Sequence, residues 1–392
     1  MKTIILKRGK EESLQRFHPW IFSGAIASKP DDLVEGDTVE VRSASGELMG
    51  TGHYEAGSIA VRMLTMDDTP VDDDFFARRL AEAWAMRRRL GLITPENTTF
   101  RLVHGEGDFL PGCVVDVYGH TAVLQAHSPG MHFARHTIAR DLVALPEAGI
   151  ENVYYKSETT LPFNAALDPV NDYIIGKYDT DVTLENGLKF HVDWLKGQKT
   201  GFFIDQRENR ALLRRLSKGA KVLNMFCYTG GFSVYALDGG ALSVDSVDSS
   251  AKAITLTDAN VALNFPGDSR HRSFAVDAFD FLRDMEPGAY DLIVLDPPAF
   301  AKHRGAIRNA MIGYRRLNEA AIAKIKPGGT IFTFSCSQAI TKEQFRTAVF
   351  TASARTGRRV KVLAQLTQPM DHPVSIYHPE GEYLKGLVIQ VE

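Results

Sequence analysis

Four short segments of the sequence place polar residues or glycines directly after an apolar run that is typical of a buried strand. A glycine lets the backbone approach a ligand closely. A carboxylate such as Asp248 can accept both hydroxyls of a ribose, and Asp277 with the amide of Ala278 can read an adenine edge. Each segment alone can equally be a strand-to-helix turn or a helix cap, but four in series favour a site for a ligand with ribose and adenine. The segments are residues 224–231, 248–249, 277–278 and 296–298.

The first of these segments does not have the spacing of a dinucleotide-binding loop. Its sequence, NMFCYTGG, lacks the G-x-G-x-x-G pattern that places a pyrophosphate on a helix N-terminus. An NAD-dependent enzyme is therefore disfavoured. A ligand with ribose and adenine but no phosphate fits better, and the sequence predicts S-adenosylmethionine as the cofactor.

A cysteine, Cys336, ends another apolar run, TIFTFSC. Most cysteines in such a place are small apolar residues that close a buried strand, and the alternative is a nucleophile. Asp296 ends the preceding strand of the series, and neighbouring strands lie about 4.8 Å apart. Both side chains can therefore reach one pocket at the carboxyl edge of the sheet, where this class of fold binds ligands. No histidine or lysine close in sequence explains how the thiol would be activated.

These residues require a sheet to position them. From about residue 181 the sequence alternates between short apolar strands and helical segments, which predicts a doubly wound α/β sheet. The helical segments are predicted at 232–240, 251–264, 314–325 and 342–355, and TKEQ at 341–344 is a capping box that begins the last of them. Two closing segments, VKVLAQLTQ and YLKGLVIQVE, can supply two more strands.

Two smaller modules precede this sheet. Residues 1–68 contain short alternating β segments separated by glycine, serine and aspartate, as in a small β-rich barrel. Residues 69–180 contain an amphipathic helix at 71–92, further strands and a helical stretch at 131–144, which predicts an α+β module. Acids in the first turn of the 71–92 helix and three arginines in its last turn complement the helix dipole. The predicted domains are therefore 1–68, 69–180 and 181–392.

Composition describes a globular protein of two or three domains, with 392 residues, 44% hydrophobic and 24% charged. The apolar stretch at the start is too short for a signal peptide, and no long apolar run follows, so we expect a cytoplasmic protein without a membrane partner. The three cysteines form no CxxC pair, which predicts neither a disulfide framework nor a metal site. Cys113 lies in a predicted core strand and Cys227 in the glycine turn, so both are weaker nucleophile candidates than Cys336.

The formal net charge of −3 gives no overall signature of nucleic-acid binding, so an RNA partner requires local basic patches. One patch lies near the N-terminus beside His18-Pro19-Trp20, and a second follows Pro297 with no acid before Asn318. A solvated helix face is the alternative for the second patch, but the run begins inside the predicted site and favours phosphate contacts. The candidate RNA-binding residues are Lys7, Arg8, Arg16, Lys302, Arg304, Arg308, Arg315 and Arg316.

The motifs together resemble a known family. GQKTGFFIDQRENR, VLNMFCYTGGFSV, VDSVDSS, DAFDFLR and YDLIVLDPPAFAK are similar to class I methyltransferases that modify large-subunit ribosomal RNA, and LKRGKEESLQRFHPWIFSGAI resembles the PUA-type RNA-binding domain that precedes them. The chain is identified along its whole length as similar to the RlmI-type 23S rRNA 5-methylcytosine methyltransferases. The resemblance implies a PUA-like domain, a small central domain and a Rossmann-like, S-adenosylmethionine-dependent catalytic domain.

The resemblance also implies roles for individual residues. Cys336 is the implied nucleophile, with Asp296 and Pro297 beside it, and ribosomal RNA or a precursor particle is the implied substrate. The sequence leaves a homodimer open. The implied cofactor residues are Thr200, Phe202 and Gln206 as a cap, Asn224, Phe226, Cys227, Tyr228 and Gly230 at the methionine end, Asp248 and Ser249 at the ribose, Asp277 and Ala278 at the adenine, and Asp296.

Two alternatives remain open at this stage. A guanine methyltransferase, acting on N7 or N2, would use Asp296-Pro297-Pro298 to position a nitrogen that can attack the methyl donor directly, and would need no cysteine. An RNA-binding assembly factor would keep the cofactor fold without catalysis. The intact set of acids after four strands counts against the assembly factor.

Overall fold

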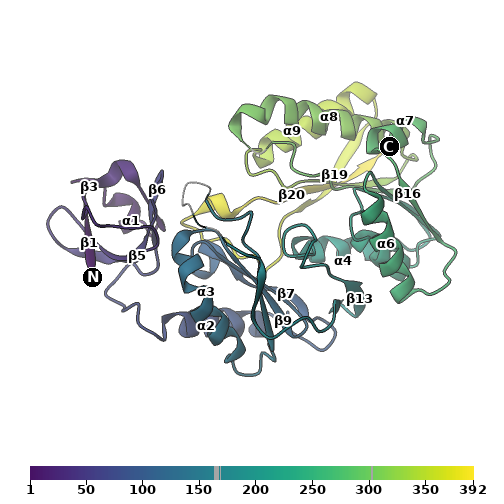
Figure 1. The fold of residues 1–392 in the computed structure, drawn as a ribbon. Helices are drawn as coiled ribbons and strands as arrows, with labels where there is room; N and C mark the ends of the chain where they lie inside the picture. Colours follow the sequence, from purple (N-terminus) through teal and green to yellow (C-terminus); the bar gives the residue numbers. More distant parts are fainter. Residues whose placement is uncertain (163–166, 168, 302) are drawn as a thin grey trace. The chain divides into compact units, whose positions relative to one another are not determined.

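The structure is a computed structural model that describes residues 1–162, 167, 169–301 and 303–392. The chain forms two compact units, each made of segments that are separate in sequence (Figure 1). None of the described helices has the length and apolar character needed to cross a lipid bilayer. Unit one contains Met1–Leu184, Val192–Ile204 and Met370–Gly381, and unit two contains Glu185–His191, Asp205–Pro369 and Glu382–Glu392.

Unit one begins with a six-stranded sheet in the order β2-β6-β5-β4-β1-β3. Alternation places Ile4 and Leu6 in its core while Ile5 between them is exposed, the period-two pattern of a strand with one buried face. This agrees with the β-rich module predicted from the sequence. The elements are β1 (Lys2–Leu6), α1 (Glu12–Gln15), β2 (Trp20–Phe22), η1 (Ser23–Ala25), β3 (Ile26–Ser28), β4 (Thr38–Arg42), β5 (Leu48–Tyr54) and β6 (Ile59–Met63).

A second sheet of unit one has five strands in the order β11-β10-β9-β8-β7. Two helices, α2 and α3, pack on it through a shared apolar core. The elements are α2 (Phe75–Arg89), β7 (Thr99–His104), η2 (Gly105–Asp108), β8 (Cys113–Tyr118), β9 (Thr121–Ala126), α3 (Pro129–Val143), β10 (Asn152–Tyr155) and β11 (Asp172–Ile175).

Helix α2 corrects two details of the sequence analysis. It is shorter than 71–92, and the aspartates at 72–74 precede its first turn instead of occupying it. Of the arginines in its last turn, Arg87 is fully buried, and its Nη2 donates to Asp108 Oδ2 at 2.8 Å and to the Asp371 carbonyl at 2.8 Å. The helix dipole therefore does not account for Arg87, which forms a buried ion pair.

The main sheet of unit two has seven strands in the order β16-β15-β14-β17-β18-β20-β19. Strands β14 to β18 are parallel to one another, while β20 is antiparallel to both β18 and β19. The elements from residue 182 onward, of which η6 and most of β12 lie in unit one, are β12 (Val182–Glu185), β13 (Leu188–His191), η4 (Ile204–Gln206), α4 (Arg207–Leu216), β14 (Lys221–Met225), α5 (Gly231–Asp238), β15 (Ser243–Asp248), α6 (Ala251–Asn264), β16 (His271–Ala275), α7 (Ala278–Asp284), β17 (Leu292–Leu295), η5 (Arg304–Ala306), α8 (Ile307–Lys324), β18 (Thr330–Ser335), α9 (Lys342–Thr356), β19 (Val360–Leu366), η6 (Pro379–Gly381) and β20 (Lys385–Val391).

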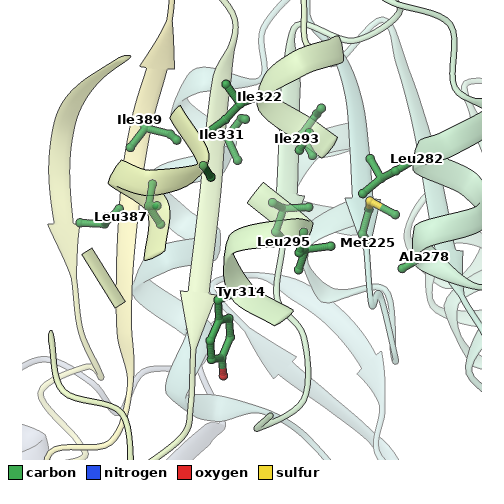
Figure 2. Packing of buried hydrophobic residues seen from close by; sticks show 14 of the residues in the cluster. Met225, Ala278, Leu282, Ile293, Leu295, Tyr314, Ile322, Ile331, Leu387 and Ile389 are labelled. Atoms are coloured by element: carbon green, nitrogen blue, oxygen red, sulfur yellow. The ribbon is translucent and has the colours of Figure 1, made fainter. Parts of the chain in front are cut away.

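Helices cover both faces of this sheet, so its central strands are apolar on both sides. Helices α7, α8 and α9 lie over one face, and α4 and α6 over the other (Figure 1). On the first face, Met225, Ile293 and Leu295 of the sheet pack with Leu282 of α7 and Ile322 of α8 (Figure 2). This core fixes the strands whose carboxyl ends carry the predicted site.

The doubly wound sheet predicted from the sequence is confirmed, and so is the adjacency of β17 and β18. The capping box is present, because Thr341 Oγ1 accepts from the Gln344 amide and Gln344 Oε1 accepts from the Thr341 amide. Helix α8 begins at Ile307, seven residues before the predicted 314, so its first two turns carry part of the basic run.

Candidate cofactor and active site

The turn after β14 has an unusual backbone. Phe226, Tyr228 and Gly230 all have a left-handed conformation, with φ values of 59°, 47° and 74°. Left-handed residues other than glycine are uncommon, and such strain is concentrated at functional sites. The turn is closed by the Gly230 amide, which donates to the Cys227 carbonyl at 2.7 Å. The result is a tight loop at the carboxyl edge of the sheet that leads directly into α5.

Asp248, at the end of β15, is joined to this turn. Its Oδ2 accepts from the Tyr228 amide at 3.1 Å and its Oδ1 accepts from the Ser250 amide at 2.9 Å. A carboxylate offers about four lone-pair positions, so these two bonds leave acceptor capacity on both oxygens. The side chain is half-buried and Ser249 is exposed, a setting that suits two ribose hydroxyls.

Asn224, on β14, provides a test of whether a cofactor fits here. Its Nδ2 donates to Ser233 Oγ at 2.9 Å, while its Oδ1 is buried and accepts from no donor among the residues that the structure describes. A buried acceptor without a donor costs free energy. The ammonium group of a bound methionine moiety is a donor that could satisfy it, so the residues present fit S-adenosylmethionine.

Asp277 is the N-cap of α7. Its Oδ1 accepts from the Phe279 amide at 2.8 Å and from the Asp280 amide at 3.2 Å. The side chain is exposed, whereas Ala278 is buried. The helix-cap role that the sequence left open is therefore real, and a role in binding adenine would be additional.

A cavity of about 360 Å³ is lined by Phe279 of α7 and by residues of α8. The Arg316 guanidinium lies 5.6 Å from the centre of the Phe279 ring, so one wall combines an aromatic face with a cation. Sequence reasoning missed this cavity, although Phe279 and Phe300 each follow a predicted motif. The lining residues are Phe279, Phe300, Asn309, Ile312, Gly313 and Arg316.

Asp296 follows β17 and is half-buried, and Pro297 after it is buried. Gln206 Nε2 donates to Asp296 Oδ2 at 3.0 Å, while Gln206 Oε1 accepts from Asn209 Nδ2 at 2.6 Å. Gln206 thus orients the carboxylate, a contact that the sequence analysis did not foresee when it placed Gln206 in a cofactor cap.

Cys336 follows directly after β18 and is half-buried, and all three cysteines, which lie in the described part of the chain, are outside any disulfide. The next residue, Ser337, donates through Oγ to the Ala301 carbonyl at 2.5 Å. This bond joins the loop after β18 to the loop after β17. Asp296 and Cys336 therefore follow adjacent strands whose loops are bonded to each other.

The other two cysteines are in different surroundings. Burial raises the pKa of Cys113 to about 12, and burial likewise raises the pKa of Cys227 to about 12. Both thiols are protonated at neutral pH and poorly reactive. Their positions, in β8 and in the glycine turn, are those predicted from the sequence.

Thr200 and Phe202 belong to unit one, whereas Gln206 and the other candidate cofactor residues belong to unit two. Thr200 is buried, and its Oγ1 donates to Asp116 Oδ2 at 2.6 Å and lies 2.9 Å from the Tyr118 hydroxyl. Phe202 is also buried. The role of these two residues as a cofactor cap remains a prediction.

The basic candidates differ in what they contact. Arg315 Nη1 donates to Glu319 Oε2 at 2.7 Å, and Arg16 forms an ion pair with Glu12. Lys7 Nζ donates to the Gly24 carbonyl at 2.9 Å. Lys302 lies outside the described residues. The exposed members are Lys7, Arg8, Arg16, Arg304, Arg308 and Arg316.

Comparison with known proteins tests the family. The model of the S-adenosylmethionine-dependent methyltransferase family matches residues 163–381, and a PUA-like domain model matches residues 4–66. Ribosomal RNA large subunit methyltransferase I of Alteromonas mediterranea is 40% identical over 99% of this chain and 98% of that protein. The chain belongs to this methyltransferase family. The protein of the same name from Shewanella amazonensis is 39% identical over 99% of both chains.

Solved structures agree in fold. A protein from Streptococcus mutans superposes with a TM-score of 0.83 at 22% identity, and a protein crystallised with SAH superposes with a TM-score of 0.85 at 23% identity. Both matches cover the whole of each chain. The methyltransferase has a PUA-like domain and a Rossmann-like catalytic fold, and its cofactor is S-adenosylmethionine. The residues that hold the cofactor stay a prediction.

Proposed function

We propose that this methyltransferase methylates carbon 5 of a cytosine in large-subunit (23S) ribosomal RNA through a covalent adduct with Cys336. The observation that carries the proposal is the half-buried Cys336 at the end of β18, one strand from Asp296 and bonded through Ser337 to the loop after β17. The names of the curated relatives support ribosomal RNA as the substrate.

The cysteine is needed because carbon 5 of cytosine is a poor nucleophile. Sγ of Cys336 adds to carbon 6, and the electron pair of the 5,6 double bond becomes available at carbon 5. Bound S-adenosylmethionine would supply an electrophilic methyl group for carbon 5, and the electron pair of the broken methyl–sulfur bond would stay with the sulfur. A base then removes the carbon 5 proton, the electron pair re-forms the double bond, and Sγ leaves as a thiolate.

Asp296 has the complementary role in this proposal. It contacts the ring nitrogen or the exocyclic amine of the base, and a proton held between its carboxyl group and the ring nitrogen offsets the negative charge that develops when the Sγ thiolate adds. The hydrogen bond from Gln206 at 3.0 Å holds the carboxylate in one orientation, and buried Pro297 fixes the backbone that follows. The target base must leave its stack to reach Sγ, because a stacked neighbour covers the face at carbon 6.

The remaining candidate residues form two groups. We assign the methionine end of the cofactor to Asn224, Phe226, Cys227, Tyr228 and Gly230, the ribose to Asp248 and Ser249, the adenine to Asp277 and Ala278, and the cap to Thr200, Phe202 and Gln206. We assign RNA phosphates to Lys7, Arg8, Arg16, Arg304, Arg308, Arg315 and Arg316, in a cytoplasmic protein.

Covalent trapping tests the proposal. RNA that carries 5-fluorocytosine at the target cannot lose its substituent from carbon 5, so the wild-type enzyme with cofactor should form a stable adduct that mass spectrometry maps to Cys336. The Cys336→Ala variant should form no adduct and lose at least about a thousandfold in methyl transfer, as expected when a covalent nucleophile is removed. Cys113→Ala is the matched control and should form the adduct normally.

The alternatives give other results. If the Cys336→Ala variant keeps full activity and the methyl group maps to guanine, the protein is a guanine methyltransferase and the proposal is wrong. Absence of methylation by the wild-type enzyme on both naked RNA and precursor particles would point to an assembly factor.

A further inference from the structure

A buried lysine stands next to the proposed nucleophile. Lys385 is the first residue of β20 and is only 6% exposed. In the antiparallel pairing of β18 with β20, its Cα partner is Ser335, the residue before Cys336. Lysine is among the residues least often buried, because its charge loses hydration there. Other contacts must therefore compensate for the hydration that the buried ammonium group has lost.

Two backbone carbonyls provide part of that compensation. Lys385 Nζ donates to the Ser337 carbonyl at 2.5 Å and to the Ile340 carbonyl at 2.7 Å. Both carbonyls belong to the loop that begins with Cys336, so the ammonium is held against this loop. An ammonium group has three donors, and these two bonds leave a third N–H for another acceptor.

The charge itself is not neutralised by a carboxylate. Among the described residues no acid forms an ion pair with Lys385, and the acid closest in sequence, Glu382, pairs with Lys342 at 2.6 Å. A buried cation without an anion is unfavourable. An anionic sulfur at Cys336 would supply the missing charge.

We propose that the Lys385 ammonium is the counter-charge of the Cys336 thiolate, and that it stabilises the anionic sulfur both as the attacking group and as the leaving group. The proposal rests on Cys336 being the nucleophile of the proposed function and names what activates it. Lys385 acts through Cys336 and is a positioning residue. It also ties the loop after β18 to β20, so that the sulfur stays at the edge of the sheet.

The electrostatics of the neighbouring groups agree with this role. Burial lowers the pKa of Lys385 to about 8, and the charge of Cys336 opposes that shift. Lys342 lowers and Glu382 raises the same pKa, and the charges of Cys336 and Asp296 act on the nearby Tyr314. Burial raises the pKa of Tyr314, so this phenol is neutral at physiological pH. The Lys385 ammonium is therefore present below about pH 8 and is lost above it, so its support for the thiolate is greatest in the neutral range.

Alkylation of Cys336 measures this directly and needs no methyl transfer. The rate of iodoacetamide labelling is followed against pH in the intact protein, with mass spectrometry of the Cys336 peptide. In the wild-type protein the midpoint of this curve of labelling rate against pH should lie below the ordinary thiol pKa of about 8.5. Lys385→Met should raise the midpoint by about one unit and slow labelling at pH 7 by about tenfold, because one pKa unit is a factor of ten in thiolate.

Matched variants separate charge from structure. Lys385→Arg keeps the charge and should label within about threefold of the wild type, and Lys342→Gln removes an exposed charge near the same loop and should shift the midpoint little. Affinity for S-adenosylmethionine, measured by calorimetry, should be unchanged in Lys385→Met. A wild-type midpoint at or above about 8.5 overturns the proposal even if Lys385→Met does not fold.

The two proposals fail in different ways. Inactive Cys336→Ala together with an unshifted midpoint in folded Lys385→Met rejects Lys385 and keeps the nucleophile. A shifted midpoint in Lys385→Met together with fully active Cys336→Ala keeps the charge pair but rejects both its catalytic use and the proposed function.

Discussion

At the scale of single residues, the candidate site contains polar atoms whose present partners leave capacity to bind a ligand. Asp248 accepts one backbone amide on each oxygen, and Asn224 has a buried oxygen that accepts from no described donor. Gln206 is different, since its amide nitrogen donates to Asp296 while its amide oxygen accepts from Asn209. The hydrogen bonds that each side chain already makes therefore determine which of its atoms can still bind a ligand.

Asp248→Asn should weaken cofactor binding. One carboxylate oxygen becomes a donor, so a ribose hydroxyl or the Tyr228 amide loses its acceptor, and a hydrogen bond to a charged group contributes about 1.5–3 kcal/mol. We expect the Kd for S-adenosylmethionine, measured by isothermal titration calorimetry, to rise about 10- to 100-fold. Asp258→Asn removes an exposed acid of the neighbouring helix α6 and is the control. Equal affinity of the two variants would remove Asp248 from the cofactor site.

At the scale of elements, the turn between β14 and α5 depends on Gly230. A Cβ at this position would meet Thr257 Cγ2 at 2.7 Å, and its φ of 74° disfavours any L side chain. Gly267 has the same backbone conformation, with φ 75°, but a Cβ there would meet nothing within 4 Å. Substitutions at the two glycines therefore distinguish the cost of backbone strain from the cost of side-chain crowding.

Gly267→Ala should cost about 1 kcal/mol in the free energy of unfolding, the usual cost of a left-handed alanine. Gly230→Ala should cost about 2–3 kcal/mol, because crowding against Thr257 is added to the strain, and it should also weaken cofactor binding. Urea denaturation measures the loss of stability in both variants, and calorimetry measures cofactor binding. Equal losses of stability in the two variants would show that Thr257 moves aside.

The strands and loops also show how much of the structure could be predicted from the sequence. The strands and their polar ends were predictable, because a strand buried on both faces is a short apolar run and the candidate site residues follow where each run stops. The pairing of Lys385 with Ser335 was not, since only tertiary structure brings the last strand beside β18. Thr200 and Phe202 lie close to Gln206 in sequence, yet the fold places them in a different unit.

At the scale of the molecule, the segment Met370–Gly381 joins unit one although the strands on either side of it, β19 and β20, belong to unit two. Its Tyr377 lies against Phe17, with ring centres 5.2 Å apart, and the two residues are 45% and 52% exposed. Arg8 and Arg16 are exposed in the same N-terminal region. Exposed aromatic rings beside basic residues are typical of surfaces that stack unpaired bases of RNA.

Phe17 and Tyr377 should therefore contribute to RNA affinity by stacking, and Arg8 by charge. Stacking contributes about 1–3 kcal/mol per base, so the double variant Phe17→Ala, Tyr377→Ala should weaken binding at least about fivefold without changing its dependence on salt. Arg8→Gln should instead reduce the slope of log affinity against log salt concentration by about 0.7, as for the loss of one phosphate contact in single-stranded RNA.

Fluorescence anisotropy with a large-subunit RNA fragment, measured from low to physiological salt, gives both quantities. Phe350→Ala, which removes a 69% exposed phenylalanine from α9, is the control and should bind as the wild type does. Unchanged affinity in the Phe17, Tyr377 double variant would exclude this surface from RNA binding and leave the basic run near Asp296 as the main contact. The double variant and Arg8→Gln together separate the contribution of stacking to RNA affinity from the contribution of charge.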